Sequence, residues 1–274
     1  DEQRQIAKVY VSAFLDTALR GSDRYLPMFR DYRHALDWLP DTLFISRYAD
    51  SRFVPIADFE ETVRPLSAWN PVTVDVLGSG RWQELELINR YGDGRHNRVA
   101  QLEWTGDEAT VTIGVPQGVL PGDIREAEAL GIALADLSAE KGDLEVVVEL
   151  ETRDGEVFRT DLGDLAPVPG PVETCFLKPF PGDLLEETVK DGELETSRET
   201  VLQSYYLSFD GDGSSEEDPD NGPDVHAAAL WRNAEGGPLP EGGAPSDIEE
   251  IRIMVEKEGG GTVLIDDIGL YLTE

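Results

Sequence analysis

Acidic side chains are the most abundant groups in this sequence that could do chemistry, and their chemistry is cation binding or acid–base catalysis. Residues 210–218 read DGDGSSEED and place oxygen ligands at alternating positions, as calcium-binding loops do. The sixth position of this loop is Ser215 and the twelfth is Asn221, where an EF-hand needs a glycine and a bidentate glutamate. A solvated acidic insertion is therefore the favoured interpretation of the loop.

The common catalytic motifs are absent from the sequence. It contains no G-x-S-x-G, H-E-x-x-H, Walker A or G-x-G-x-x-G motif, and its three histidines (His34, His96 and His226) lie in unrelated contexts. The single cysteine, Cys175, excludes an intrachain disulfide and a cysteine-based zinc site. Choosing two of the 56 acidic residues as the acid and base of a glycan hydrolase would be arbitrary, so the sequence leaves open whether the chain is an enzyme.

Aromatic side chains offer a second kind of chemistry, because a ring face can stack on a sugar ring or on another flat ligand. Inward rings of a β-sandwich fill the core, whereas outward rings can form such a platform. Tyr205 and Tyr206 are adjacent in a predicted strand and must face opposite sides, so one of them points away from the core. We predict ligand-binding residues among Tyr205, Tyr206 and Trp231.

Two kinds of element must position these groups. Apolar residues recur at helical spacing over residues 3–20, and Gly21 follows where a C-cap is expected; a shorter helical turn is predicted over residues 23–30. From about Val54 onward, short strands alternate with Gly, Pro and Asp, and no crossover helices separate them. The pattern predicts a mainly β fold, an antiparallel jelly-roll β-sandwich preceded by an α-helical segment.

The expected organisation is a helical segment at 1–50 and a jelly-roll sandwich at 51–274. Asp154-Gly155 predicts a hairpin, and Thr105-Gly106-Asp107 predicts a second one. Two insertions rich in acid, Gly and Pro are expected near 163–199 and 210–247.

The charge balance excludes one class of partner. A net charge of −33, with five Lys and 18 Arg, makes a nucleic-acid binder that neutralises phosphates untenable. So many hydrated carboxylates repel one another unless salt screens them, which indicates adaptation to a high-salt environment; an ordinary acidic secreted protein is the alternative. No run of 18 apolar residues is present, so no membrane span is expected.

Two stretches resemble known families. The opening QIAKVYVSAFLDTALRGSDRYLPMFRDYRHALDWLPDTLFISRYADS resembles the end of the catalytic domain in secreted bacterial α/β-hydrolases of the lipase, esterase and polyester-hydrolase group. IADFEETVRPLSAWN and GTVLIDDIGLYL resemble the first and last strands of carbohydrate-binding-module-like jelly rolls, and GDGRHNRVAQLEWTG is similar to a middle part of that fold. The long acidic insertions have no counterpart in this resemblance.

The resemblance implies a function and a metal. The hydrolase nucleophile, acid and histidine would all precede Asp1, so the chain would be a non-catalytic C-terminal accessory module of a secreted or cell-surface hydrolase. Its partners would be its own upstream catalytic domain and a polysaccharide or polyester. The resemblance also places a structural calcium ion on Asp58, Glu60 and Asp267, for which ordinary exposed strand-end acids are the alternative.

Two further functions stay open at this point. The first alternative to the accessory module is a hydrolase of glycans or esters that uses two carboxylates of its own. The second is a purely structural interaction domain without a small ligand. Binding of a polymer without turnover separates the accessory module from both.

Overall fold

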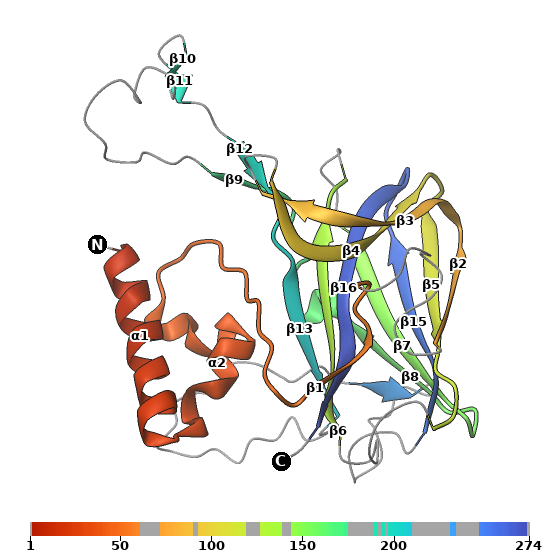
Figure 1. Cartoon of the computed structure of the whole chain (residues 1–274), viewed down its shortest axis with the longest axis horizontal. Helices are drawn as coiled ribbons and strands as arrows, with labels where there is room; N and C mark the ends of the chain where they lie inside the picture. Colours follow the sequence, from red (N-terminus) through yellow and green to blue (C-terminus); the bar gives the residue numbers. More distant parts are fainter. Residues whose placement is uncertain are drawn as a thin grey trace.

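A helical unit stands beside a two-sheet β-sandwich in the computed structural model (Figure 1). The structure describes residues 2–60, 72–89, 93–118, 127–138, 144–174, 189–190, 193–194, 197–209, 231–233 and 247–272. The predicted calcium-like loop at 210–218, and most of the insertion at 210–247, lie outside these residues.

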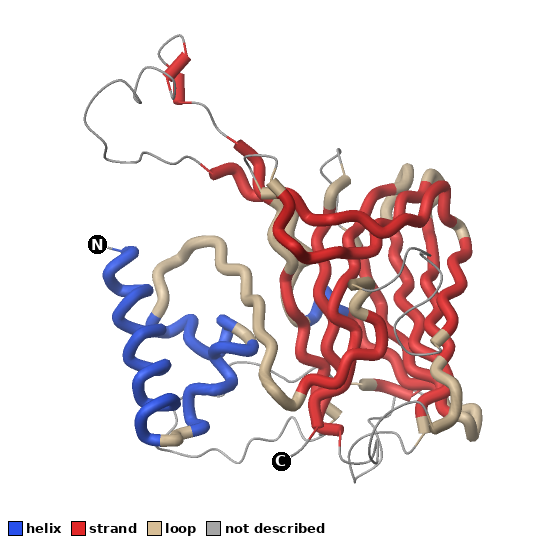
Figure 2. Tube along the Cα trace, viewed as in Figure 1, coloured by secondary structure: helices blue, strands red, loops and turns tan. Residues whose placement is uncertain are grey.

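The helical unit spans residues 2–38 and has a small core of its own. It contains α1 (Glu2–Arg20), η1 (Asp23–Tyr25), α2 (Leu26–Arg30) and η2 (Tyr32–Trp38), which confirms both predicted helical segments. One face of α1 packs through Ile6, Val9 and Ala13 on Met28 and Ala35. A linker, residues 39–52, then leads into the first strand (Figure 2).

The sandwich consists of two six-stranded sheets. Sheet A has the order β13-β6-β16-β4-β3, with β1 also paired to β16, and sheet B has the order β14-β8-β7-β15-β5-β2. Every strand pairing among the described residues is antiparallel, which confirms the predicted fold class. The strands are β1 (Phe53–Ala57), β2 (Thr73–Leu77), β3 (Ser79–Ile88), β4 (Gly94–Trp104), β5 (Glu108–Gly114), β6 (Ala127–Asp136), β7 (Glu145–Thr152), β8 (Val157–Asp161), β13 (Gln203–Ser208), β14 (Arg232–Asn233), β15 (Ile248–Glu256) and β16 (Gly261–Leu272).

Smaller elements connect these strands. A 3₁₀ turn, η4 (Leu162–Asp164), follows β8, and β9 (Val172–Thr174) pairs with β12 (Ser197–Glu199). A two-residue pair, β10 (Val189–Lys190) with β11 (Glu193–Leu194), lies within the predicted insertion near 163–199.

The core lies between the sheets because alternate residues of each strand face inward. Sheet A contributes residues such as Leu102 and Ile265, and sheet B contributes residues such as Val148 and Ile253, all fully buried. The packed sandwich gives the residues on the outer faces a rigid support.

One predicted hairpin is confirmed and the other is wrong. Gly155 adopts a φ of +82° in the turn between β7 and β8, which pair with each other. Residues 105–107 instead join β4, in sheet A, to β5, in sheet B. Gly-Asp turn chemistry suits either connection, and the pairing is decided by which sheet each strand packs into.

Candidate functional site

The outer face of sheet A brings together polar and aromatic side chains from several strands. On β4, Ala100 and Leu102 face the core, so Val99 and Gln101 face outward. The strand register places Gln101 between Gln83 of β3 and Leu264 of β16. Figure 1 shows β3 and β4 bending across the top of this sheet.

A row of half-buried polar side chains occupies the β3–β4 end of this face. The side-chain amide of Gln83 donates to the Gln101 carbonyl oxygen at 2.6 Å. One step along the strands, Glu103 lies opposite Thr262 of β16. Beside this polar row, on the same face, is a buried apolar cluster that packs the strands together: Leu87, Val99, Ala133, Ala135, Leu202 and Leu264.

The centre of the face is a β-bulge in β16 that holds two adjacent aspartates. Asp267 adopts a φ of +49°, and the register with β6 shifts between Asp266 and Gly269. Asp266 is fully buried, and its Oδ2 accepts hydrogen bonds from Asn97 Nδ2 at 3.1 Å and Arg47 Nη2 at 3.0 Å. The same Nη2 donates to Asp267 Oδ2 at 2.7 Å.

Burial dominates the electrostatics of both aspartates. It raises the pKa of Asp266 to about 7, helped by the charge of Asp267 and opposed by hydrogen bonds from Asn97 and Arg47. Burial likewise raises the pKa of Asp267, where Arg47 acts in the opposite direction and Asp58 adds to the increase. Arg47 is thus the positive charge that opposes the increase at both aspartates.

An aromatic and ionic clamp at the β13 side of the face ties the helical unit to sheet A. Arg30 of α2 lies 4.4 Å above the Tyr206 ring and contacts Glu128 Oε1 at 2.9 Å, while Arg52 contacts Glu128 Oε2 at 3.0 Å. Tyr206 also packs against Tyr271, with ring centroids 5.1 Å apart. Burial raises the pKa of Glu128, but the Tyr206 hydroxyl and the two guanidinium groups lower it more, so the carboxylate stays ionised.

The structure places the three predicted platform residues in different surroundings. Tyr205 is 4% exposed, and its hydroxyl donates to the Ala166 carbonyl at 3.2 Å inside the core. Trp231 is 2% exposed and stacks on Phe209 with ring centroids 5.8 Å apart. Only Tyr206 faces away from the core, as the alternation requires, and there Arg30 covers it. None of the three therefore presents an open ring face in this structure.

The predicted calcium residues come only partly together. Asp58 lies close enough to Asp267 to raise its pKa. The Glu60 carboxylate instead accepts a hydrogen bond from the Arg98 backbone N–H at 2.9 Å. Within the part of the chain that the structure describes, no group of three or more acidic, His or Cys side chains is arranged to hold a metal ion. Calcium binding stays a prediction, and the three carboxylates as placed do not fit it.

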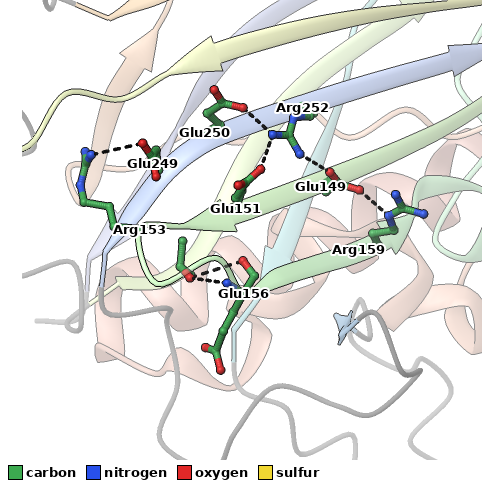
Figure 3. Close-up of polar contacts among 9 residues, drawn as sticks. Glu149, Glu151, Arg153, Glu156, Arg159, Glu249, Glu250 and Arg252 are labelled. Carbon is green, nitrogen blue, oxygen red and sulfur yellow. Dashed lines mark hydrogen bonds and ion pairs between the residues drawn. The ribbon is translucent and has the colours of Figure 1, made fainter.

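The outer face of sheet B carries a network of ion pairs (Figure 3). Glu149 of β7 contacts Arg159 of β8, and its other oxygen accepts from Arg252 of β15 at 2.5 Å. Arg252 also contacts Glu151 and, at 2.5 Å, Glu250. Each guanidinium neutralises neighbouring carboxylates, so the network stabilises the pairing of three strands.

Comparisons with known proteins were made for sequence and for structure. No protein-family model matches the chain, and no curated protein matches it. Among solved structures, an exo-β-agarase is similar at 16% identity and a TM-score of 0.44, over 80% of this chain and 25% of that one. The family 11 carbohydrate-binding module of a Clostridium thermocellum cellulosomal cellulase is similar at 11% identity and a TM-score of 0.40, over 81% of this chain and 95% of the module.

A third similar structure is a carbohydrate-binding module described for specific mannan recognition, at 12% identity and a TM-score of 0.34, over 82% and 100% of the two chains. The chain thus spans about a quarter of the agarase chain and nearly the whole length of the two modules. The fold class rests on the strand pairing itself. None of the described helices is long and apolar enough to cross a membrane.

Sequence reasoning did not find Gln83, Gln101 or Arg47. The alternation in WQELELI places Gln83 and Leu85 on one face of β3 and Trp82 on the other. Because each face then carries a large apolar side chain, the pattern does not say which face is outward. Arg47 lies 219 residues from Asp266, and no local pattern links such distant positions.

Proposed function

We propose that the chain is a non-catalytic carbohydrate-binding accessory module. The observation that carries the proposal is the half-buried row of Gln83, Gln101, Glu103 and Thr262 on the outer face of sheet A. Amides, hydroxyls and carboxylates supply the donors and acceptors that sugar hydroxyl groups need. These groups sit on strands whose apolar side chains on the same face are buried and packed, so they are held in place before a ligand arrives.

The groups in this row suit binding rather than turnover. Amide and hydroxyl side chains hydrogen-bond to a ligand but do not exchange protons with it near neutral pH. A hydrolase that worked here would need a second carboxylate beside Glu103, placed across the scissile bond. Bound but unchanged ligand is therefore the expected outcome of any assay.

We predict that replacing either glutamine by alanine weakens oligosaccharide binding about tenfold, the effect of losing roughly 1.4 kcal/mol of hydrogen bonding. The probes are a β-1,3-1,4-linked glucan tetrasaccharide, a mannan oligosaccharide and an agarose oligosaccharide, with a polyester film for the alternative polymer. Isothermal titration calorimetry on the whole chain measures the affinity.

A matched control is Thr112→Ala, which alters a half-buried polar residue on the outer face of sheet B. It should leave affinity unchanged. Hydrolysis of any probe, or equal affinity of the parent chain, Gln83→Ala and Gln101→Ala, would contradict the proposal.

We further propose that the helical unit packs against a catalytic domain that precedes it in a longer hydrolase of the esterase or lipase type. The face of α1 turned away from its small core exposes Phe14 (59%), Leu15 (46%) and Leu19 (77%). A pocket of about 640 Å³ lies alongside, lined in part by Leu15, Leu19, Tyr25 and Trp38. Such a cluster of large apolar groups is typical of a surface that another protein covers.

The charge distribution supports the same docking surface. Residues 1–52 contain eight acidic and eight basic residues, so the whole net charge of −33 belongs to residues 53–274. A contact surface excludes hydrated carboxylates because burying them without partners is costly. The helical unit, which has five acidic and six basic residues, is therefore the part of this acidic chain best suited to a lasting protein contact.

Two measurements test the docking. The coding sequence upstream of residue 1 is expected to contain a G-x-S-x-G motif followed by Asp and His. In that longer protein, amide exchange at residues 11–19 should slow at least tenfold relative to the isolated chain, and Leu19→Glu should abolish the protection. The control is Leu77→Glu, at an equally exposed apolar position of β2, which should leave the protection of residues 11–19 unchanged. The proposal would be contradicted if the upstream coding sequence lacked the hydrolase motif, or if amide exchange at residues 11–19 were the same in the longer protein and in the isolated chain.

A further inference from the structure

The aspartate pair on the β16 bulge places two carboxylates where solvent can reach only one of them. The Asp266 side chain is 1% exposed and that of Asp267 is 35% exposed. A buried carboxylate without a cationic partner is costly, so the pair demands a positive charge at this place. The sequence resemblance implied a metal ion on Asp58, Glu60 and Asp267; beside Asp266 and Asp267 the structure places a cationic side chain.

That side chain is Arg47, which reaches the pair from the linker. A single nitrogen, Nη2, donates to Asp266 Oδ2 at 3.0 Å and to Asp267 Oδ2 at 2.7 Å, so one guanidinium bridges both carboxylates. Asn97 supplies the remaining described hydrogen bond, at 3.1 Å to Asp266 Oδ2. The geometry is that of a cation held between two anionic ligands.

Backbone contacts on both sides of Arg47 fix its position. The Ser46 N–H donates to Gln203 Oε1 at 2.9 Å, and the Ser46 carbonyl accepts from the Ser204 N–H at 2.8 Å. The Tyr48 N–H donates to Ser204 Oγ at 3.3 Å. Because β13 holds the linker through these bonds, the Arg47 backbone is fixed within reach of the two carboxylates before the guanidinium pairs with them.

We propose that Arg47 is the resident cation of the first-strand and last-strand junction, in the place of a metal ion. The guanidinium pairs with both Asp266 and Asp267 and offsets one of their two negative charges, and at the same time it locks the linker, and with it the helical unit, onto sheet A. The folded chain accordingly has no need of calcium. Removal of the guanidinium opens the same carboxylates to a divalent cation.

The test compares the whole chain with Arg47→Gln in 5 mM calcium chloride and in 5 mM EDTA at equal ionic strength. The melting temperature of the parent chain should agree within about 1 °C in the two buffers. Arg47→Gln should melt several degrees lower than the parent in EDTA and recover at least half of that loss in calcium. Isothermal titration of calcium should show binding to the variant and none to the parent.

The matched control is Arg153→Gln, which removes an arginine that follows β7 of sheet B and pairs with Asp247 and Glu249. It changes the net charge equally and should gain no response to calcium. Arg47→Lys, which keeps the charge, should stay insensitive to EDTA.

Several results would overturn the proposal. These are calcium binding to the parent chain, a parent that melts several degrees lower in EDTA, an Arg47→Gln variant as stable as the parent, or a variant that calcium does not rescue. If Arg47→Gln does not fold in either buffer, the calcium titration of the parent chain decides alone, because the proposal requires that it bind none.

Discussion

Replacing Trp231 by alanine is expected to lower the free energy of unfolding by about 3 to 5 kcal/mol, the usual cost of emptying a large aromatic site in a packed core. The Trp231 side chain is 2% exposed, stacks on Phe209, and directs its indole N–H to the Leu207 carbonyl at 3.5 Å. Removing the ring leaves a cavity between the sheets that the surrounding strands can fill only partly. Urea titration followed by circular dichroism measures the change.

The same substitution at Trp38 is the control. Trp38 is 46% exposed on the helical unit, so Trp38→Ala should cost about 1 kcal/mol or less. A Trp231 variant that unfolds like the parent but binds oligosaccharide more weakly would contradict its place in the core. That outcome would support the ligand platform predicted from the sequence.

The predicted platform shows where local patterns stop being informative. Alternation along a strand decides that Tyr205 and Tyr206 face opposite sides, and the structure agrees with this. Alternation does not decide what covers an outward ring. Arg30 covers Tyr206, and it belongs to a helix far away in the sequence.

Strand and helix positions were predictable because they depend on local periodicity. The wrong hairpin at residues 105–107 depends on something else, the sheet in which each strand finds a partner. β4 pairs with β3 and β16, whereas β5 pairs with β15 and β2. Residues distant in sequence fix these choices, so a turn motif alone misassigned the connection.

The candidate site was harder to predict for the same reason. Asp267 was singled out and does lie in the polar centre of sheet A, beside the buried Asp266. Gln83 and Gln101 are 18 residues apart and meet only because β3 and β4 pair in one particular register. The register of a strand pair depends on the whole sheet, whereas hydrophobic periodicity is a local property of the sequence.

Salt should stabilise the chain strongly. All of the net charge of −33 lies on residues 53–274, and the screening length falls from about 10 Å in 0.1 M salt to about 3 Å in 1 M salt. We expect the melting temperature to rise by roughly 10 °C between 0.05 M and 2 M sodium chloride, equivalent to about 3 to 5 kcal/mol for a chain of this size. Potassium chloride should act equally, because screening does not depend on which monovalent cation is used. A flat or falling curve would contradict adaptation to high salt.

A row of three glutamates on the outer face of sheet B gives this repulsion a local test. Glu256 of β15 lies directly opposite Glu145 of β7 on one side and Glu108 of β5 on the other, and all three are exposed. Like charges directly opposite each other destabilise a strand pair. Glu256→Gln should therefore raise the melting temperature by a few degrees in 0.05 M salt and leave it nearly unchanged in 2 M salt.

The matched control for the glutamate row is Glu250→Gln on the same strand, which weakens an ion pair with Arg252 instead of relieving repulsion. It should not raise the melting temperature at either salt concentration. If Glu256→Gln raised it equally at both concentrations, the gain would come from strand propensity and not from charge. Because screening removes only the electrostatic part, the difference between the two salt concentrations isolates the repulsion that the acidic sandwich carries.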